Sequence, residues 1–325
     1  MEHIPKHSEI GQPRNTAVYL NATSTRRVVQ VFINPAYFVT TFWPLYSFSD
    51  LVFLLCICCN VMSINEMCAL THVRRRIILN NPRKRNALSL SMLESLRGDI
   101  LADVDSPDLR VIIISAEGPV FSSGHDLREL TSARGPEYHR RVFRTCTQVM
   151  TLIQDLPVPV IAMVNGVATA AGCQLVASCD VAVASDKSTF ATPGVNVGLF
   201  CSTPAVAVGR AVPSKVAMEM LFTGTPISAR DALRHGLLSK VVPEERLEAE
   251  TLAVARRVCG ASRPVVALGK AAFHRQMSQS RDAAYAAASE AMVDNLALRD
   301  GQEGIRAFVE KREPVWSHRA ESVHD

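Results

Sequence analysis

Two short, unbroken runs of apolar residues place the strongest constraint on the fold of this chain. Val111–Ile114 reads Val-Ile-Ile-Ile, and Val158–Val164 reads Val-Pro-Val-Ile-Ala-Met-Val. Ile77–Leu79 and Val181–Val183 are shorter runs of the same kind. None of them alternates apolar with polar residues, so none is a strand with one face in water. Such strands belong to a parallel sheet that helices cover on both faces.

Helical patterns separate these strands. Ser91–Glu94 resembles a capping box, and Leu93, Leu96, Ile100 and Leu101 recur at helical spacing. Other helical patterns cover residues 137–154 and 170–177, and the stretch 204–308 is mainly helical. Alternating strands and helices that give way to a helical tail predict α/β layers with a C-terminal helical region.

Composition and charge exclude several classes of function. The chain has 325 residues, of which 48% are hydrophobic and 20% are charged, so it can bury a large core. Its net charge of +4 is spread along the sequence, without the basic runs of a nucleic-acid-binding protein. The nine cysteines lack the paired spacing of a zinc site. We therefore expect reduced thiols, no metal and no nucleic-acid partner.

Residues 1–71 differ in character from the rest of the chain. Between positions 28 and 73 only Asp50 and Glu66 carry a formal charge. The cleanest apolar run, Leu51–Met62, is shorter than the roughly 20 residues that a transmembrane helix needs. The segment also matches a mitochondrial presequence only weakly, because it is not consistently rich in Arg and poor in acidic residues. We favour an atypical, poorly ordered hydrophobic leader over contact with a membrane.

Two loops that contain glycine follow buried strands, which is where open α/β folds hold their ligands. They are Gly118–Leu127 and Val164–Gln174, and the second runs into a predicted helix. Small residues let the backbone approach a ligand, and the start of a helix offers N–H groups without helical partners. Side by side, the loops could each give one N–H to a single carbonyl oxygen, forming an oxyanion hole. Taken singly, either loop could equally be a tight connection.

Three segments, which overlap the apolar strands and the two loops, together resemble a known protein family. Phe121–Leu127, Pro159–Gly166 and Ala171–Leu175 resemble the enoyl-CoA hydratase/isomerase (crotonase) superfamily. Shorter matches follow in the family's order at Asn81–Pro82, Arg85–Leu88, Ser178–Asp180, Phe222–Gly224, Gly236–Leu238 and Phe308–Arg312. An ordered set of matches is far more specific than any single motif.

The resemblance implies a crotonase (ClpP-like) fold, which is an α/β spiral of ββα turns followed by a C-terminal helical region. It implies an acyl-CoA thioester as ligand, no further cofactor, assembly as a homotrimer or homohexamer, and a mitochondrial location. The domain then spans residues 72–319, between the leader and a polar tail at 320–325. Family members begin with a strand that pairs with the Ile77–Leu79 strand. Met67–His72 is a poor candidate for that strand, so we expect an unpaired sheet edge.

The resemblance also assigns roles to residues of the two loops. The backbone N–H groups of His125 and Ala171 would form the oxyanion hole. Ala170 and Ala171 stand where the family often has glycine, and alanine keeps the N–H but has less freedom in φ. Thr192–Gly194 and Phe200–Thr203 would shape a small apolar acyl pocket. The residues implied in binding CoA or its acyl group are Lys84, Arg85, Ser123, His125, Asp126, Leu127, Arg128, Ala171 and Lys311.

Two positions depart from the family's hydratases, which carry a glutamate at each of them. Here they hold Gln174 and Gly194. Hydration needs a proton delivered to Cα and a water deprotonated for attack at Cβ, and neither residue can exchange a proton at neutral pH. Loss of one acid–base group lowers a rate by about 10²- to 10⁴-fold. No catalytic residue is therefore assigned, and restoring both glutamates should create hydration if the oxyanion hole is intact.

Three functions remain open at this point. The first is an acyl-CoA-binding protein of fatty-acid or lipid metabolism that keeps the oxyanion hole and has weak or absent enoyl-CoA hydratase activity. The second is an active decarboxylase or thioester hydrolase on a branched or dicarboxylic acyl-CoA, with His125 or Gln174 taking part. The third is a non-catalytic interaction subunit of crotonase oligomers. We favour the first, because an interaction subunit has no physical need of two aligned donor loops.

Overall fold

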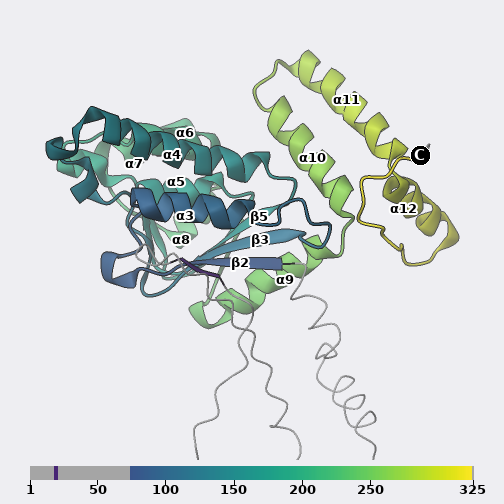
Figure 1. The fold of residues 1–325 in the computed structure, drawn as a ribbon, viewed down its shortest axis with the longest axis horizontal. Helices are drawn as coiled ribbons and strands as arrows, with labels where there is room; N and C mark the ends of the chain where they lie inside the picture. The colour runs from purple at the N-terminus through teal and green to yellow at the C-terminus, as the bar shows by residue number, and fades with distance from the viewer. Residues whose placement is uncertain (1–17, 21–73, 324–325) are drawn as a thin grey trace, which may run out of the picture.

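The computed structural model describes residues 18–20 and 74–323, and a six-stranded parallel sheet forms the centre of the domain (Figure 1). In order across the sheet, its strands are β1 (Val18–Leu20), β2 (Arg74–Leu79), β3 (Val111–Ala116), β5 (Val160–Val164), β7 (Val181–Ser185) and β10 (Lys240–Val242). Each strand is parallel to its neighbours. The two long apolar runs of the sequence form β3 and β5, and β5 is buried along its whole length, as predicted.

A second sheet holds four short strands, β4 (Val120–Ser122), β6 (Val167–Thr169), β8 (Thr189–Ala191) and β9 (Ile227–Ser228). The first three are parallel, and β9 pairs antiparallel with β8. Each of the first three follows a strand of the large sheet and precedes a helix: α4 (Gly135–Asp155), α5 (Ala171–Ser178) or α6 (Ser202–Ala211). The predicted spiral of ββα turns is therefore confirmed.

Helices cover both faces of the large sheet, which explains why its central strands β3 and β5 are apolar on both sides (Figure 1). α3 (Leu90–Leu101), α4, α5, α6, α7 (Ser214–Thr223) and α8 (Ala229–Arg234) lie on one side, and α9 (Leu247–Cys259) lies on the other. The side chains of β3 divide accordingly. Ile112 and Ile114 belong to the larger core cluster, whereas Ile113 packs in a smaller cluster with Leu247 and Cys259 of α9.

The edge of the large sheet differs from the sequence prediction. β1 pairs with β2 through Val18 opposite Ile77 and Leu20 opposite Leu79, so the edge that we expected to be unpaired carries a three-residue strand. The rest of the predicted leader, including Met67–His72, lies outside the described residues. Among the residues that are described, no helix combines the length and the apolar character that a membrane span requires.

Helix α3 begins two residues earlier than the sequence pattern suggests. The capping residue is Ser89, whose Oγ accepts a hydrogen bond from the Met92 N–H at 3.3 Å. The carboxylate of Glu129 accepts a second bond from the Leu90 N–H at 2.7 Å. The predicted capping box at Ser91–Glu94 is therefore wrong by two residues. The bond from Glu129 also ties the start of α3 to the loop that follows β4.

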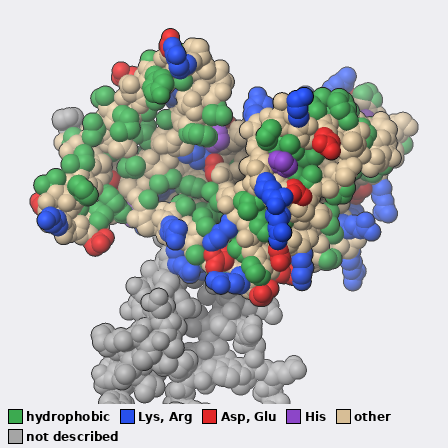
Figure 2. All heavy atoms as spheres, turned by 180° about the vertical axis from the view of Figure 1, so that it is seen from behind, with side chains coloured by type: hydrophobic (Ala, Val, Ile, Leu, Met, Phe, Trp, Pro, Cys, Tyr) green, Lys and Arg blue, Asp and Glu red, His purple; other side chains and the backbone are tan. Residues whose placement is uncertain are grey.

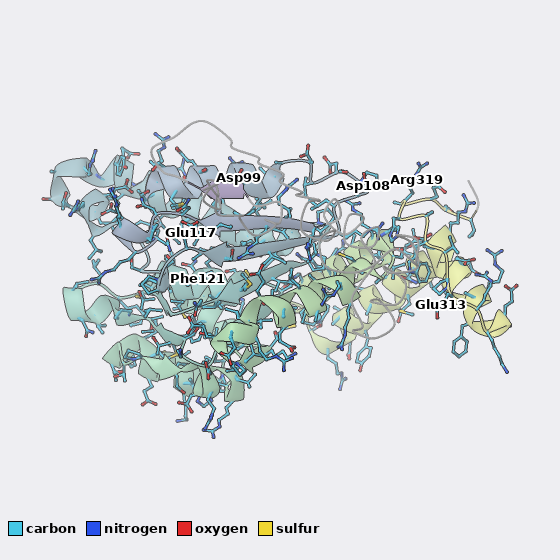
Figure 3. The ribbon with its side chains drawn as sticks, turned by 90° about the horizontal axis from the view of Figure 1, so that it is seen from below. Asp99, Asp108, Glu117, Phe121, Glu313 and Arg319 are labelled. Carbon is cyan, nitrogen blue, oxygen red and sulfur yellow. The ribbon has the colours of Figure 1, made fainter. Side chains whose placement is uncertain are left out.

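Three helices follow the body of the domain and lie beyond one end of the sheet (Figure 1). They are α10 (Arg263–Gln276), α11 (Arg281–Ala297) and α12 (Arg299–Glu310). Seen from below, Phe121 lies inside the body, whereas Glu313 and Arg319 lie at the far C-terminal end (Figure 3). The helices of this region expose several large apolar side chains (Figure 2), namely Tyr285, Met292, Val293, Phe308 and Val309.

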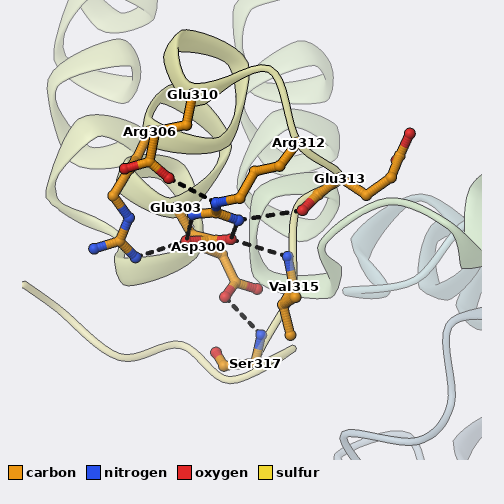
Figure 4. Close-up of polar contacts among 8 residues, drawn as sticks. All are labelled: Asp300, Glu303, Arg306, Glu310, Arg312, Glu313, Val315 and Ser317. Carbon is orange, nitrogen blue, oxygen red and sulfur yellow. Dashed lines mark hydrogen bonds and ion pairs between the residues drawn. The ribbon is translucent and has the colours of Figure 1, made fainter.

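A cluster of charged groups fastens the last segment of the described chain to α12 (Figure 4). Both carboxylate oxygens of Glu303 accept hydrogen bonds from the guanidinium of Arg312, at 2.6 and 3.0 Å. The same carboxylate accepts bonds from Arg306 at 2.6 Å and from the Val315 N–H at 3.0 Å. Asp300 accepts a bond from the Ser317 N–H at 2.8 Å. These bonds hold the pKa of Glu303 well below its ordinary value, with the bond from Arg312 as the largest cause.

This lowered pKa predicts an acid-sensitive C-terminal region. The stabilisation by Glu303 should be complete above its ordinary pKa of 4.5 and should be lost progressively as the pH falls below it. We expect Glu303→Gln to unfold at a lower temperature than the parent chain at about pH 7, where the carboxylate is ionised in both states. The difference should shrink as both proteins are melted at lower pH. A difference that stays constant down to about pH 3 would contradict this role.

Candidate functional site

A cavity of about 450 Å³ opens between the two predicted loops and the start of α6. Its wall is made by Ser123, His125, Leu127, Leu130, Phe143, Ala170, Ala171, Pro193, Gly194, Val197, Leu199, Phe200, Cys201, Ser202, Thr203 and Pro204. Most of these side chains are apolar, and none of them is Asp, Glu, Lys or Arg. The structure thus brings the two loops together and supports the expectation of an apolar pocket.

The two loops touch through glycine. Gly124 has a φ of +84°, and a Cβ atom there would lie 2.9 Å from the Cβ of Ala170 and 3.2 Å from the nitrogen of Ala171. At Gly172, in the first turn of α5, a Cβ would lie only 2.5 Å from the carbonyl oxygen of Ser122. Both contacts are shorter than side chains tolerate, so the fit of the loops depends on glycine at these two positions.

The backbone donors expected for an oxyanion hole belong to residues on the wall of this cavity. Ala171 is the first residue of α5, so its N–H has no acceptor within the helix. The neighbouring donors are already used, because the Gly124 N–H bonds to the Ser122 hydroxyl and the Ala170 N–H bonds to the Ala191 carbonyl. Within the described part of the chain, the N–H groups of His125 and Ala171 bond to no carbonyl. Both are available to a ligand.

The alanine before α5 adopts a backbone conformation that favours glycine. Ala170 has φ +51° and ψ −120°. Its N–H donates to the Ala191 carbonyl at 2.9 Å, and its own carbonyl accepts from the Gln174 N–H at 3.0 Å. These bonds hold a conformation that costs a residue with a Cβ on the order of 1–3 kcal/mol. The restricted φ expected for alanine therefore produces backbone strain at Ala170, the residue before the Ala171 N–H donor.

The imidazole of His125 is held in one orientation. Its Nδ1 lies 3.2 Å from the carbonyl oxygen of Leu88, so Nδ1 carries the proton and donates this bond. The ring packs edge-on against Phe143 at a centroid distance of 5.3 Å. Burial is the main cause that lowers the pKa of His125. The side chain is therefore a neutral imidazole at neutral pH, and its Nε2 is buried without a partner.

One buried asparagine that the sequence analysis did not single out organises the first loop. The side-chain amide of Asn86 donates to the carbonyls of Glu117 at 2.9 Å and Val120 at 2.7 Å. Its Oδ1 accepts from the Asn81 N–H at 2.8 Å, and its own carbonyl accepts from the Ser122 hydroxyl at 2.8 Å. Asn86 also has a φ of +51°, a region that asparagine tolerates better than most residues. The position of Asn86 within the Arg85–Leu88 motif is the sequence signal that could have identified this role.

The two positions of the missing glutamates differ in their surroundings. Gly194 lies on the cavity wall, and a Cβ there would lie 2.5 Å from the Leu199 carbonyl oxygen and 2.7 Å from the sulfur of Cys201. Gln174 is 4% exposed and does not line the cavity, and its Oε1 has no hydrogen-bond partner. Restoring a glutamate at position 194 therefore needs a shift of the Leu199–Cys201 backbone, which the sequence alone did not reveal.

The residues expected to bind CoA divide into two groups. Ser123 and Leu127 line the cavity, and the Lys84 ammonium lies 3.7 Å from the Asp126 carboxylate beside it. The carbonyl oxygen of Arg85 accepts a hydrogen bond from the Ser123 N–H. Arg128 lies two residues after Asp126 in the same loop. Lys311, by contrast, follows α12 in the C-terminal region and does not line this cavity.

Cys146, Cys173, Cys179 and Cys201 are free thiols, and burial makes them poor nucleophiles. Burial raises the pKa of Cys146 and of Cys173 to about 12. Cys201, on the cavity wall, also has a raised pKa, mainly because it is buried. Over the described ranges, no group of three or more His, Cys, Asp or Glu residues could hold a metal ion.

The strain at Ala170 predicts a stabilising substitution. Ala170→Gly should raise the free energy of unfolding by about 1 kcal/mol, because glycine adopts this conformation without strain. Ala286 is exposed in α11, so Ala286→Gly is the matched control and should lower the free energy of unfolding by about 1 kcal/mol. Chemical denaturation measures both. If the two variants lose stability equally, Ala170 is not strained.

Comparisons with known proteins cover the same part of the chain. Residues 75–319 match the enoyl-CoA hydratase/isomerase family. A protein of Danio rerio named enoyl-CoA hydratase domain-containing protein 3, mitochondrial, is 76% identical over 250 residues, or 77% of this chain and 86% of the relative. The Homo sapiens protein of the same name is 71% identical over 244 residues, or 75% of this chain and 80% of the relative.

Solved structures agree with the sequence comparisons. The crystal structure of human enoyl-CoA hydratase domain-containing protein 3 gives a TM-score of 0.75 at 70% identity, covering 75% of this chain and 97% of that one. An enoyl-CoA hydratase from Mycobacterium smegmatis gives a TM-score of 0.72 at 45% identity, covering 74% of this chain and 94% of that one.

Proposed function

The chain belongs to the enoyl-CoA hydratase/isomerase (crotonase) family, and we propose that it binds acyl-CoA thioesters but hydrates enoyl-CoA weakly or not at all. One observation carries this proposal. The packing of Gly124 against Ala170 and Ala171 brings two backbone donors to the cavity, whose wall holds no carboxylate. Such a site can bind and polarise a thioester carbonyl, but it cannot supply the proton transfers of hydration.

The N–H groups of His125 and Ala171 would form the oxyanion hole. The helical start at Ala171 adds the positive end of the α5 dipole, although this helix is short. The side chain of His125 is fixed by its bond to Leu88, so its role in this proposal is through the backbone. The neutral imidazole also keeps a positive charge away from the acyl group.

The loss of hydration follows from the two changed positions. A water molecule that attacks Cβ needs a base, and Gln174 and Gly194 offer none. The raised pKa of the Cys201 thiol disqualifies it as a substitute. Isomerisation by a single carboxylate at position 194 is also disfavoured, because Gly194 has no side chain.

The wall of the cavity also bears on the acyl chain. Leu127, Phe143, Val197, Leu199 and Phe200 offer it apolar contacts. A dicarboxylic chain would place a carboxylate beside these residues without a Lys or Arg partner on the wall, and burial of an unpaired charge is strongly unfavourable. The decarboxylase or hydrolase alternative on dicarboxylic substrates is therefore less well supported than simple binding.

The outer parts of the ligand would meet the charged loop at the mouth. We assign Lys84 and Arg85 to the neighbourhood of the CoA nucleotide and the segment Ser123–Arg128 to its backbone contacts. The exposed apolar side chains of α11 and α12 support assembly as a homotrimer or homohexamer. In such an assembly Lys311 could reach the CoA of a neighbouring copy.

The cellular setting follows from the relatives. The proteins of Danio rerio and Homo sapiens carry "mitochondrial" in their names. We therefore assign this chain to the mitochondrion and to fatty-acid or lipid metabolism.

Binding depends on the contact between the loops, which gives a direct test. Gly124→Ala should weaken the affinity for butyryl-CoA at least about tenfold, because the new Cβ collides with Ala170 and the backbone of Thr169. Gly98→Ala in α3 is the matched control, since a Cβ there meets nothing within 4 Å. Isothermal titration of the full chain measures affinity, and a melting curve shows that each variant is folded.

Two outcomes would contradict the proposed function. Equal affinity of the folded Gly124→Ala variant and the parent chain would remove the loops from the binding site. Rapid conversion of crotonyl-CoA to its hydrated product, followed by mass spectrometry of every CoA species, would show that the carboxylates are dispensable. We expect the enoyl-CoA to be bound and recovered largely unchanged.

A further inference from the structure

A single buried serine touches both loops of the cavity. Ser122 is the last residue of β4, is 0% exposed, and stands two positions before Gly124. Its hydroxyl donates to the carbonyl of Asn86 at 2.8 Å and accepts from the Gly124 N–H at 3.3 Å. Its carbonyl oxygen and Cβ lie 2.5 and 2.8 Å from the place where a Cβ of Gly172 would stand. Ser122 is therefore bonded to the first loop and packed against the first turn of α5.

The hydroxyl is one of two anchors on the glycine that precedes the His125 donor. Gly124 has a φ of +84°, and the backbone of glycine turns more readily than that of other residues. The peptide group before Gly124 is held through its N–H, which donates to the Ser122 hydroxyl. The peptide group after it, which contains the His125 N–H, is held through the Gly124 carbonyl, which accepts from the Leu88 N–H at 2.7 Å. Without the hydroxyl, only the second anchor restrains Gly124.

The group that accepts the Ser122 proton is itself fixed. Asn86 has a φ of +51°, and its side-chain amide donates to the carbonyls of Glu117 and Val120. Because the Asn86 carbonyl accepts the hydroxyl proton, the Ser122 oxygen presents a lone pair to the Gly124 N–H. Hydrogen bonds in such a chain polarise and strengthen one another. Asn86 therefore sets the direction of the hydroxyl.

We propose that Ser122 is a positioning residue, whose hydroxyl holds the His125 N–H in the direction in which it polarises a bound thioester carbonyl. This inference rests on the proposed function, which assigns that N–H to the oxyanion hole. Preorganised donors are effective because they need no reorientation when the ligand binds. Loss of the hydroxyl removes this preorganisation and leaves the Gly124 N–H and the Asn86 carbonyl without their partner.

The test removes the hydroxyl alone. Ser122→Ala should lower the affinity for butyryl-CoA about tenfold in isothermal titration of the full chain, which is the effect of losing about one hydrogen bond. The ligand is labelled with ¹³C at the thioester carbonyl, and its stretch should lie closer to the frequency of the free ligand than in the parent complex. Ser122→Cys, which replaces the hydroxyl by a weaker donor and acceptor, should give an intermediate frequency. Melting curves show whether each variant is folded.

Ser115→Ala is the matched control. Ser115 lies in β3, is 1% exposed, and does not line the cavity. Its hydroxyl makes the same two kinds of bond, because it donates to the Ile77 carbonyl at 3.4 Å and accepts from Nε of Arg76 at 3.1 Å. Ser115→Ala should therefore lower the melting temperature, as Ser122→Ala should, without moving the carbonyl stretch. The comparison separates a positioning role from the general loss of a buried hydrogen bond.

Two results would overturn the inference and leave the proposed function standing. One is a folded Ser122→Ala variant in which the bound carbonyl keeps the frequency of the parent complex. The other is an equal change of frequency in Ser115→Ala. If Ser122→Ala does not fold, Ser122→Cys decides in the same way, since a frequency equal to that of the parent complex overturns the inference and a shift towards free ligand supports it. Failure of the parent chain to bind butyryl-CoA, or to shift its carbonyl stretch, would overturn the proposed function as well.

Discussion

The close contact of Gly124 with Ala170 and Ala171 is the constraint on which the rest of the site depends. Two parallel ββα turns bring their loops together at this point, and only residues without a large side chain allow it. The contact sets the N–H groups of His125 and Ala171 on one cavity and holds Ala170 in a strained conformation. Asn86 supports it through hydrogen bonds that fix the backbone of the first loop.

The same packing bears differently on the binding of an acyl-CoA and on its hydration. In the function proposed above, the loops supply the pair of preorganised donors that a thioester carbonyl needs. The segment around Leu199 and Cys201 closes over Gly194 and fills the space in which a second carboxylate would stand. Restoring both glutamates is thus a larger change than two substitutions, because the backbone at Leu199 must move first. This agrees with the proposed function, in which the pocket holds an acyl group without hydrating it.

Much of this arrangement could be predicted from the sequence. The unbroken apolar runs of β3 and β5 required a sheet covered on both faces, and the ordered motifs identified the spiral and both loops. The clearance at Gly194, the hydrogen bonds of Asn86 and the pairing of β1 could not be predicted. Each depends on which segments, distant in the chain, meet in space. The two hydrogen bonds of the Ser122 hydroxyl are likewise visible only once its neighbours are in place.

Polarisation of the bound thioester tests the central claim most directly. We would record difference infrared spectra of butyryl-CoA, labelled with ¹³C at the thioester carbonyl, free and bound to the full chain. Two hydrogen bonds from His125 and Ala171 should shift the carbonyl stretch to lower frequency, while mass spectrometry recovers the ligand intact. A bound ligand whose carbonyl stretch does not move would contradict the account, because binding would then not involve the oxyanion hole.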